Sequence, residues 1–89
     1  MAEIESYRYV VKRSAAKQLR RCPRRQAILD WLEVVTRDPF RPDRNVRPLT
    51  GINAGYRRRF GDWRVSYLID QEARLIEVFE VARRGGAYR

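Results

Sequence analysis

The sequence contains no histidine, a single cysteine and a single methionine. Without histidine, and with Cys22 as the lone thiol, it offers neither the ligands of a zinc site nor an internal disulfide. No apolar run approaches the roughly 20 residues that cross a bilayer, and the N-terminus lacks a signal-peptide pattern. We therefore expect a cytoplasmic protein that uses no metal or other cofactor.

Acidic residues and lysine are also scarce. Eleven acidic residues face twenty basic ones, eighteen of them arginine, and the net charge is +9. The excess is uneven, since residues 41–59 hold six arginines and one acid, and residues 81–89 hold three arginines and none. The planar guanidinium suits phosphate. The balance predicts an anionic partner: nucleic acid, an acidic protein or, less favoured because no helix pattern is both basic and strongly apolar, a membrane surface.

The length of 89 residues allows one domain, 1–89, and ten aromatic residues with 44% apolar content indicate a globular one. Residues 5–12 alternate apolar and polar side chains and predict the first strand. Ser14 precedes a run of helix formers and is typical of an N-cap. This helix should end near Cys22, because Pro23 disfavours helical geometry before it and can itself open the next helix.

The second predicted helix runs to about Arg37 and carries one apolar stripe, Ile28, Trp31, Leu32 and Val35. We assign Trp31 to the core. Residues 40–54, rich in proline, arginine, asparagine and glycine, are expected to form a loop.

The run YRRRFGDWRVSYLID, residues 56–70, predicts two strands joined by a tight turn at Gly61-Asp62. Alternation puts Arg57 and Arg59 on one face, with Arg64 on the corresponding face of the second strand. Arg58 falls on the apolar face, so either its stem extends to the sheet edge or the register shifts by one residue.

Residues 75–82 predict the last strand, although both of its alternating faces are largely apolar. The fold class is therefore α+β: a small, mostly antiparallel sheet with an N-terminal helical hairpin on one face, in the order β-α-α-β-β-β.

The sequence resembles the RelE/ParE toxin superfamily of bacterial toxin–antitoxin systems. The resemblance covers nearly the whole chain and rests on the basic helical hairpin and three segments: DPF…RPLTG (38–51), YRRRFGDWRVSYLID (56–70) and VARRGGAYR (81–89). It implies a RelE-like fold and a ribosome-dependent mRNA endonuclease. Such a toxin cleaves mRNA by attack of a ribose 2′-hydroxyl on the adjacent phosphate, needs no metal and is neutralised by an acidic antitoxin.

The resemblance also implies a catalytic set, Arg57, Arg59, Arg64, Arg83 and Tyr88. Arg84 competes with Arg83 for one of these positions, because the spacing to the tyrosine varies in the family. Five further arginines are expected to contact the RNA backbone: Arg41, Arg44, Arg47, Arg84 and Arg89. The three in the 40–54 segment fit a solvated rim of the protein equally well.

This sequence departs from the family in its general base. Arginine stays protonated, so the strand positions that carry lysine in relatives cannot accept a proton here. Tyr88 is one candidate base, and transfer through the substrate or ribosomal RNA is the other. The main alternative function is a ParE-like inhibitor of DNA gyrase without ribonuclease activity, and a plain nucleic-acid-binding module is a third.

Overall fold

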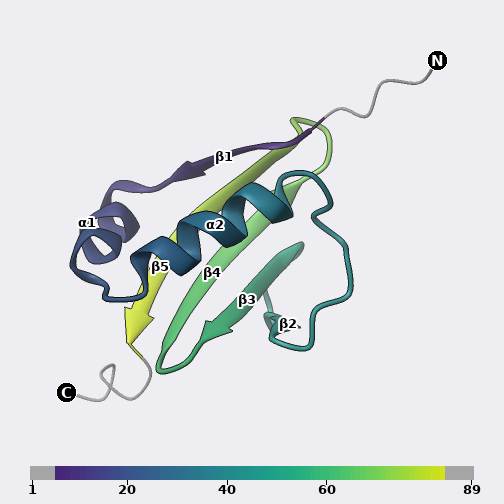
Figure 1. Ribbon diagram of the computed structural model, residues 1–89. Coiled ribbons are helices and arrows are strands. Elements are labelled where there is room, and N and C mark those ends of the chain that lie inside the picture. The colour runs from purple at the N-terminus through teal and green to yellow at the C-terminus, as the bar shows by residue number, and fades with distance from the viewer. Residues whose placement is uncertain (1–5, 84–89) are drawn as a thin grey trace.

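A computed structural model describes residues 6–83, which form two helices and one five-stranded sheet (Figure 1). In chain order the elements are β1 (Arg8–Val11), α1 (Arg13–Arg21), α2 (Arg25–Val35), β2 (Val46–Pro48), β3 (Gly55–Phe60), β4 (Trp63–Asp70) and β5 (Leu75–Arg83). The strand order is β1-β5-β4-β3-β2, with β1 parallel to β5 and every other pair antiparallel. The predicted α+β class is confirmed. No helix within residues 6–83 is long and apolar enough to cross a membrane.

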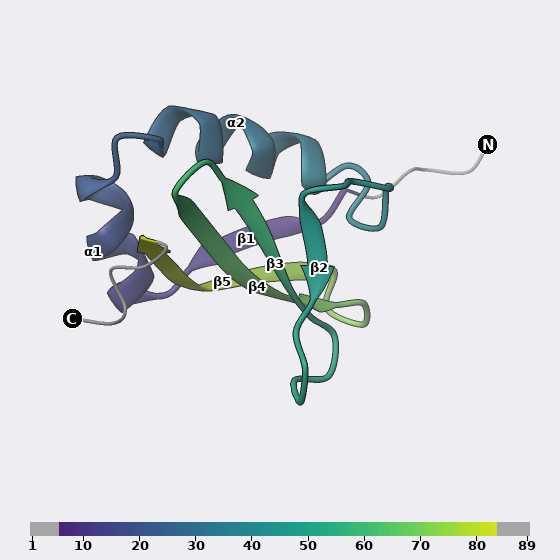
Figure 2. The same cartoon turned by 90° about the horizontal axis from the view of Figure 1, so that it is seen from below.

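The core lies between α2 and the sheet, while α1 packs beside β5 (Figure 2). The predicted apolar stripe of α2 is buried throughout. Trp31 meets the rings of Phe60 and Tyr67 edge-on, with centroids 5.5 and 5.1 Å away, so its assignment to the core is confirmed. Each large apolar side chain buried in this way stabilises the fold by roughly 1.5–3 kcal/mol. The helices thus cover one face of β3 and β4 and leave the other face open.

Both helix starts differ from the prediction. The backbone N–H of Lys12 still donates to Val78 of β5, and Ala16 N–H already donates to Lys12. The chain therefore passes from strand to helix without a linker, and Ser14 lies inside the first turn instead of capping it. Pro23 does not open α2, because it lies in the turn that precedes Arg25. The predicted end of α1 at Cys22 is confirmed, since this residue is the C-cap.

The segment predicted as a loop contains the short strand β2, which extends the sheet beyond β3. Three residues with one proline carry no alternation from which a strand could be predicted. The strand pairs with β3, and Asp43 anchors the segment before it: its carboxylate accepts the backbone N–H of Asn45 at 2.8 Å and the Nε–H of Arg58 at 3.0 Å.

The same ion pair decides between the two alternatives for Arg58. Arg58 lies opposite Val65 in the predicted register, so the strand does not shift. Its guanidinium reaches the sheet edge over the ring of Phe60, 4.3 Å from the centroid, and ends on Asp43. The stem is therefore accommodated on the helix-facing side without disturbing its neighbours.

The ambiguous faces of β5 are explained by an irregularity in the sheet. Ser66 lies opposite Glu80, whereas the next residue, Tyr67, lies opposite Val78, so Phe79 is an extra residue in β5. A bulge of this kind shifts the alternation by one residue. As a result Val78 and Val81 are both buried, although three positions separate them, and Glu80 is opposite a residue of the open face.

Candidate nucleic-acid interface

The open face of β3 and β4 carries the arginines that alternation predicted there. Arg57 lies opposite Ser66, and Arg59 lies opposite Arg64. Gly61 adopts a φ of 60°, which lets the two strands reverse within the Gly61-Asp62 turn. Two arginines directly opposite each other repel. A one-residue shift of β3 against β4 would separate the two arginines, but it would also move the apolar side chains of the other face out of the core. The strands therefore keep this register despite the repulsion.

These side chains line a hollow of about 300 Å³, which we call the arginine hollow. The β2 segment supplies its second wall. The lining residues are Arg44, Asn45, Arg47, Pro48, Leu49, Arg57, Arg59, Trp63 and Arg64. Five of these nine residues are arginine and none is acidic. Five fixed positive charges around one small volume favour an anion with several oxygens, such as a phosphate group.

Two of the arginines are oriented by hydrogen bonds along the sheet. The Nε–H of Arg57 points to the Ser66 hydroxyl at 3.5 Å, and this hydroxyl donates to Glu80 at 2.9 Å. Ser66 is completely buried, so the chain from Arg57 to Glu80 has a rigid centre. The Nε–H of Arg59 donates to the carbonyl of Gly61 at 3.3 Å. In both residues the bond uses Nε and leaves the terminal nitrogens available to a ligand.

Arg64 differs from its neighbours in the hollow. Its Nε is buried and has no hydrogen-bond partner within the part of the chain that the structure describes. A buried donor without a partner costs roughly 1–3 kcal/mol relative to a satisfied one. No ligand reaches a buried atom, so an anion in the hollow would have to bind the terminal nitrogens of Arg64.

Electrostatics also hold the wall of the hollow in place. Partial burial raises the pKa of Asp43, but the Asn45 N–H and the Arg58 guanidinium outweigh it and lower the pKa below its ordinary value. Asp43 is therefore ionised at neutral pH and paired with Arg58. Elsewhere, burial raises the pKa of the Tyr67 hydroxyl and of the Cys22 thiol, so neither is a reactive group at neutral pH.

The structure brings together three members of the predicted catalytic set, Arg57, Arg59 and Arg64. Arg83 does not line the arginine hollow. It lies opposite Trp63 at the end of β5, where it lines two other surface hollows. Tyr88 falls outside the described residues.

Among the predicted RNA contacts, Arg44 and Arg47 line the arginine hollow, while Arg41 is exposed and outside it. Arg84 and Arg89 also fall outside the described residues.

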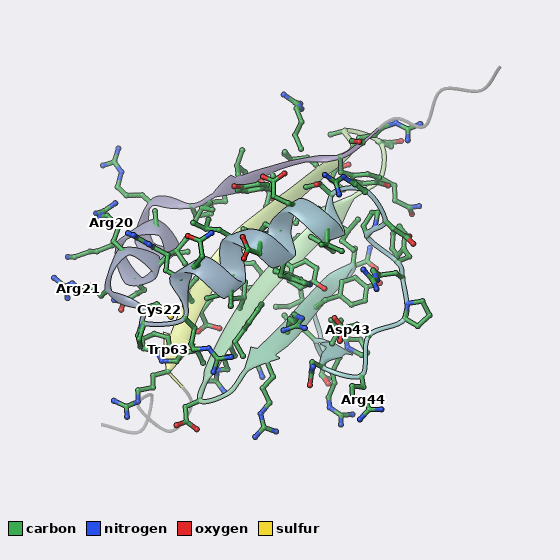
Figure 3. All side chains as sticks on the ribbon, viewed as in Figure 1. Arg20, Arg21, Cys22, Asp43, Arg44 and Trp63 are labelled. Carbon is green, nitrogen blue, oxygen red and sulfur yellow. The ribbon has the colours of Figure 1, made fainter. Side chains whose placement is uncertain are left out.

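Sequence reasoning missed two features of the site. The Ser66–Glu80 pair depends on the bulge in β5, for which alternation gives no signal. Alternation puts Trp63 on the apolar face of β4 with Val65, yet it also lines the arginine hollow at the end of the sheet. Figure 3 labels it near Arg21 and Cys22, whereas Asp43 and Arg44 lie on the segment that carries β2. The sequence signal for this position of Trp63 is that it directly follows the Gly61-Asp62 turn.

The fold and the arginine hollow define a small, basic α+β protein with an arginine-rich face. A sequence model of the family described as "ParE toxin of type II toxin-antitoxin system, parDE" matches residues 9–88. The chain therefore belongs to this family, within the RelE/ParE superfamily, and is a toxin of a type II toxin–antitoxin system. A comparison with curated proteins gives no match.

Solved structures show the same fold. RelE in the archaeal RelE–RelB complex of Pyrococcus horikoshii OT3 is 24% identical, with a TM-score of 0.79 over 92% of this chain and 99% of that one. The isolated Escherichia coli RelE toxin is 22% identical, with a TM-score of 0.75 over 93% and 92%. The YoeB/ParE toxin from Agrobacterium tumefaciens is 20% identical, with a TM-score of 0.73 over 86% and 98%.

Proposed function

We propose that this toxin is a ribosome-dependent mRNA endonuclease that cleaves by attack of a ribose 2′-hydroxyl on the adjacent phosphate. The observation that supports the proposal is the arginine hollow, in which five guanidinium groups surround a volume of about 300 Å³ on a rigid sheet. A toxin that only occupies a protein surface does not need such a concentration of charge around one point.

The chemistry of the reaction matches the charge of the hollow. As the 2′-oxygen attacks, negative charge grows on the phosphate oxygens, and preorganised cations stabilise this state more than the ground state. Arg64 is placed at the reacting phosphate in this proposal, because it lines the hollow from β4 directly opposite Arg59. Arg57 and Arg59, oriented by Ser66 and Gly61, hold the phosphate from the side of β3. Removing one such donor typically lowers the rate about 10²- to 10³-fold.

No lining residue of the arginine hollow accepts a proton at neutral pH, since its charged members are all arginine. We therefore assign positioning and charge stabilisation to these residues. The proton of the 2′-hydroxyl passes either to Tyr88 or through the substrate and ribosomal RNA.

The partner that neutralises the toxin is, in this proposal, an acidic antitoxin, and both act in the cytoplasm. The net charge of +9 favours an acidic protein. Relatives of the same fold are described in complexes of RelE with RelB, from Pyrococcus horikoshii and from Methanococcus jannaschii.

A second candidate function is inhibition of DNA gyrase by binding alone. It is favoured by the family match, whose description is that of ParE toxins. In that case the arginine hollow would be a docking surface, and no RNA product would form.

Mapping of mRNA 5′ ends after induction of the toxin in cells tests the proposal. We expect cuts in translated messages for the native chain and none for Arg64→Ala. Arg8→Ala is the matched control, because it removes the same charge from an exposed position of β1 outside the hollow, and it should cut normally. Normal cutting by Arg64→Ala would contradict the assigned role. DNA damage without any mRNA cuts would replace the nuclease with the gyrase inhibitor.

A further inference from the structure

Trp63 occupies the place where three surface hollows meet. It is the first residue of β4, directly after the Gly61-Asp62 turn, and it is only partly buried. Its side chain lines the arginine hollow and two further hollows, of about 430 and 480 Å³, at the end of β5 and beside the turn between the helices. An aromatic side chain shared by three hollows presents more surface than packing against the core requires.

The hollow beside the helical turn continues the positive charge of the arginine hollow, whereas the hollow at the end of β5 has one arginine and one glutamate. The one beside the helical turn is lined by Arg21, Arg24 and Arg83 together with Trp63. Across the three hollows there are eight arginines and two acidic residues, Asp62 and Glu80. A chain of phosphates that leaves the arginine hollow toward the helices therefore finds cations ahead of it, and it must pass Trp63 to reach them.

Arg24 shows that the helical turn is packed tightly against this end of the sheet. A β-carbon at Gly61 would lie 2.5 Å from Nη1 of Arg24, so the guanidinium rests on the backbone of the β3–β4 turn. The cation therefore lies beside the turn that leads into Trp63, and both side chains line the same hollow.

The two tryptophans of the chain have different surroundings. Trp31 is 9% exposed and enclosed by Phe60 and Tyr67, so no base can reach its ring. Trp63 adjoins open hollows on a basic surface. Grooves that combine cations with an aromatic ring bind single-stranded nucleic acid by backbone contacts and base stacking, and stacking on one ring typically contributes about a 5- to 150-fold factor in affinity.

We propose that Trp63 is a stacking platform for a base of single-stranded RNA, placed between the arginine hollow and a second backbone-binding hollow at Arg21, Arg24 and Arg83. The inference rests on the proposed function in taking RNA as the ligand. It adds a binding site beyond the scissile phosphate and gives Arg83 a role in holding the strand, distinct from the position at the reacting phosphate that the sequence predicts.

Tryptophan fluorescence tests the proposal with the full chain. The probe is a single-stranded 2′-O-methyl RNA oligonucleotide, which has no 2′-hydroxyl and cannot be cleaved by the proposed mechanism. In Trp31→Phe the emission comes from Trp63 alone, and saturable quenching by the probe is expected. In Trp63→Phe the emission comes from Trp31, and it should remain unquenched at probe concentrations that saturate binding, as followed by anisotropy of a labelled probe.

Affinity provides the second measurement. Trp63→Ala should weaken probe binding about 5- to 150-fold, and Trp63→Phe less, because a smaller ring still stacks. Circular dichroism establishes that each variant is folded. The Trp31→Phe titration is an independent test, because it leaves Trp63 unchanged. Unquenched Trp63 at saturation, or equal affinity of folded Trp63→Ala and native protein, would overturn the proposal.

The same preparations separate this inference from the proposed function. Quenching of Trp63 in a chain that produces no mRNA cuts supports the platform and overturns the nuclease. Conversely, in-frame cuts by a chain whose Trp63 stays unquenched support the nuclease and overturn the platform.

Discussion

The ion pair between Asp43 and Arg58 offers the sharpest test of how the site is assembled. It joins the segment before β2 to β3 across fifteen positions of sequence, with 3.0 Å between Oδ2 and Nε. The two side chains are only 18% and 19% exposed. Besides this ion pair, the wall that carries Arg44 and Arg47 is attached to the sheet by the pairing of β2 and by backbone hydrogen bonds of Asn45 and Leu49 to β3.

The substitution Asp43→Asn removes the charge and retains an oxygen for the Asn45 N–H. A hydrogen bond to a charged group contributes roughly 1.5–3 kcal/mol. Because the pair keeps some contact with water, we expect a loss of about 1–2 kcal/mol in the free energy of unfolding. For a domain of this size that corresponds to a fall in Tm of roughly 4–16 °C.

Thermal unfolding followed by circular dichroism measures this change. Asp30→Asn is the matched control, because Asp30 is exposed on α2 and accepts only the side chain of Gln26. It should change stability by no more than about 0.5 kcal/mol. Equal Tm values for the two variants would refute the reasoning.

The difference in stability between the native chain and Asp43→Asn should change with pH in a defined direction. The pKa of Asp43 is lowered in the folded protein from an ordinary value of 3.8. A carboxyl group with a depressed pKa stabilises the fold above its unfolded value and loses this contribution as the pH falls through the folded one. The native chain should therefore exceed Asp43→Asn in stability at neutral pH, and the difference should shrink as the pH falls below 3.8 and vanish below the lower pKa of the folded state. A difference that grows on acidification would contradict the ion pair.

Three further predictions concern the arginine hollow, its turn and Tyr88. Ser66→Ala removes the link between Arg57 and Glu80. A lost hydrogen bond of roughly 0.5–1.5 kcal/mol should lower the mRNA cleavage rate about two- to tenfold, and an unchanged rate would show that Arg57 needs no such support. Gly61→Ala places a β-carbon against Arg24 at a φ of 60°, so urea unfolding should show a loss of about 1–2 kcal/mol; an undiminished midpoint would argue against this turn geometry. If Tyr88 stacks on the substrate, Tyr88→Phe should keep much more cleavage activity than Tyr88→Ala, whereas equal losses would point to its hydroxyl and to proton transfer.

The two proposals about RNA predict different effects for Arg64→Ala and Trp63→Ala. Arg64→Ala is expected to abolish cleavage with the fold intact, whereas Trp63→Ala is expected to weaken the binding of the strand. Affinity and cleavage rate should therefore respond to different residues of one continuous surface.

Local alternation was sufficient to predict the strands of the β3–β4 hairpin and their faces. Side chains of a strand point to opposite sides with a period of two, so the positions of Arg57 and Arg59 relative to Phe60 follow from the order of residues. The apolar stripe of α2 is predicted in the same way by the helical period. Both are properties of a short stretch of backbone.

Other parts of the site depend on contacts between distant residues. No local pattern marks β2 as a strand; its pairing with β3 and the contact of Asp43 with Arg58 both join residues that are far apart in the sequence. The bulge at Phe79 is equally invisible in the alternation, yet it brings Glu80 to Ser66.

The sequence by itself determined the charge, the fold class, the two helices and the sheet face on which Arg57, Arg59 and Arg64 lie. Only the tertiary structure decided that Arg44 and Arg47 close the hollow, that Arg83 stands outside it, and that Trp63 joins it to its neighbours. The physical reason is the range of the interactions. Periodicity acts between residues a few positions apart, whereas a hollow is enclosed by side chains whose distance is set by the packing of the whole chain.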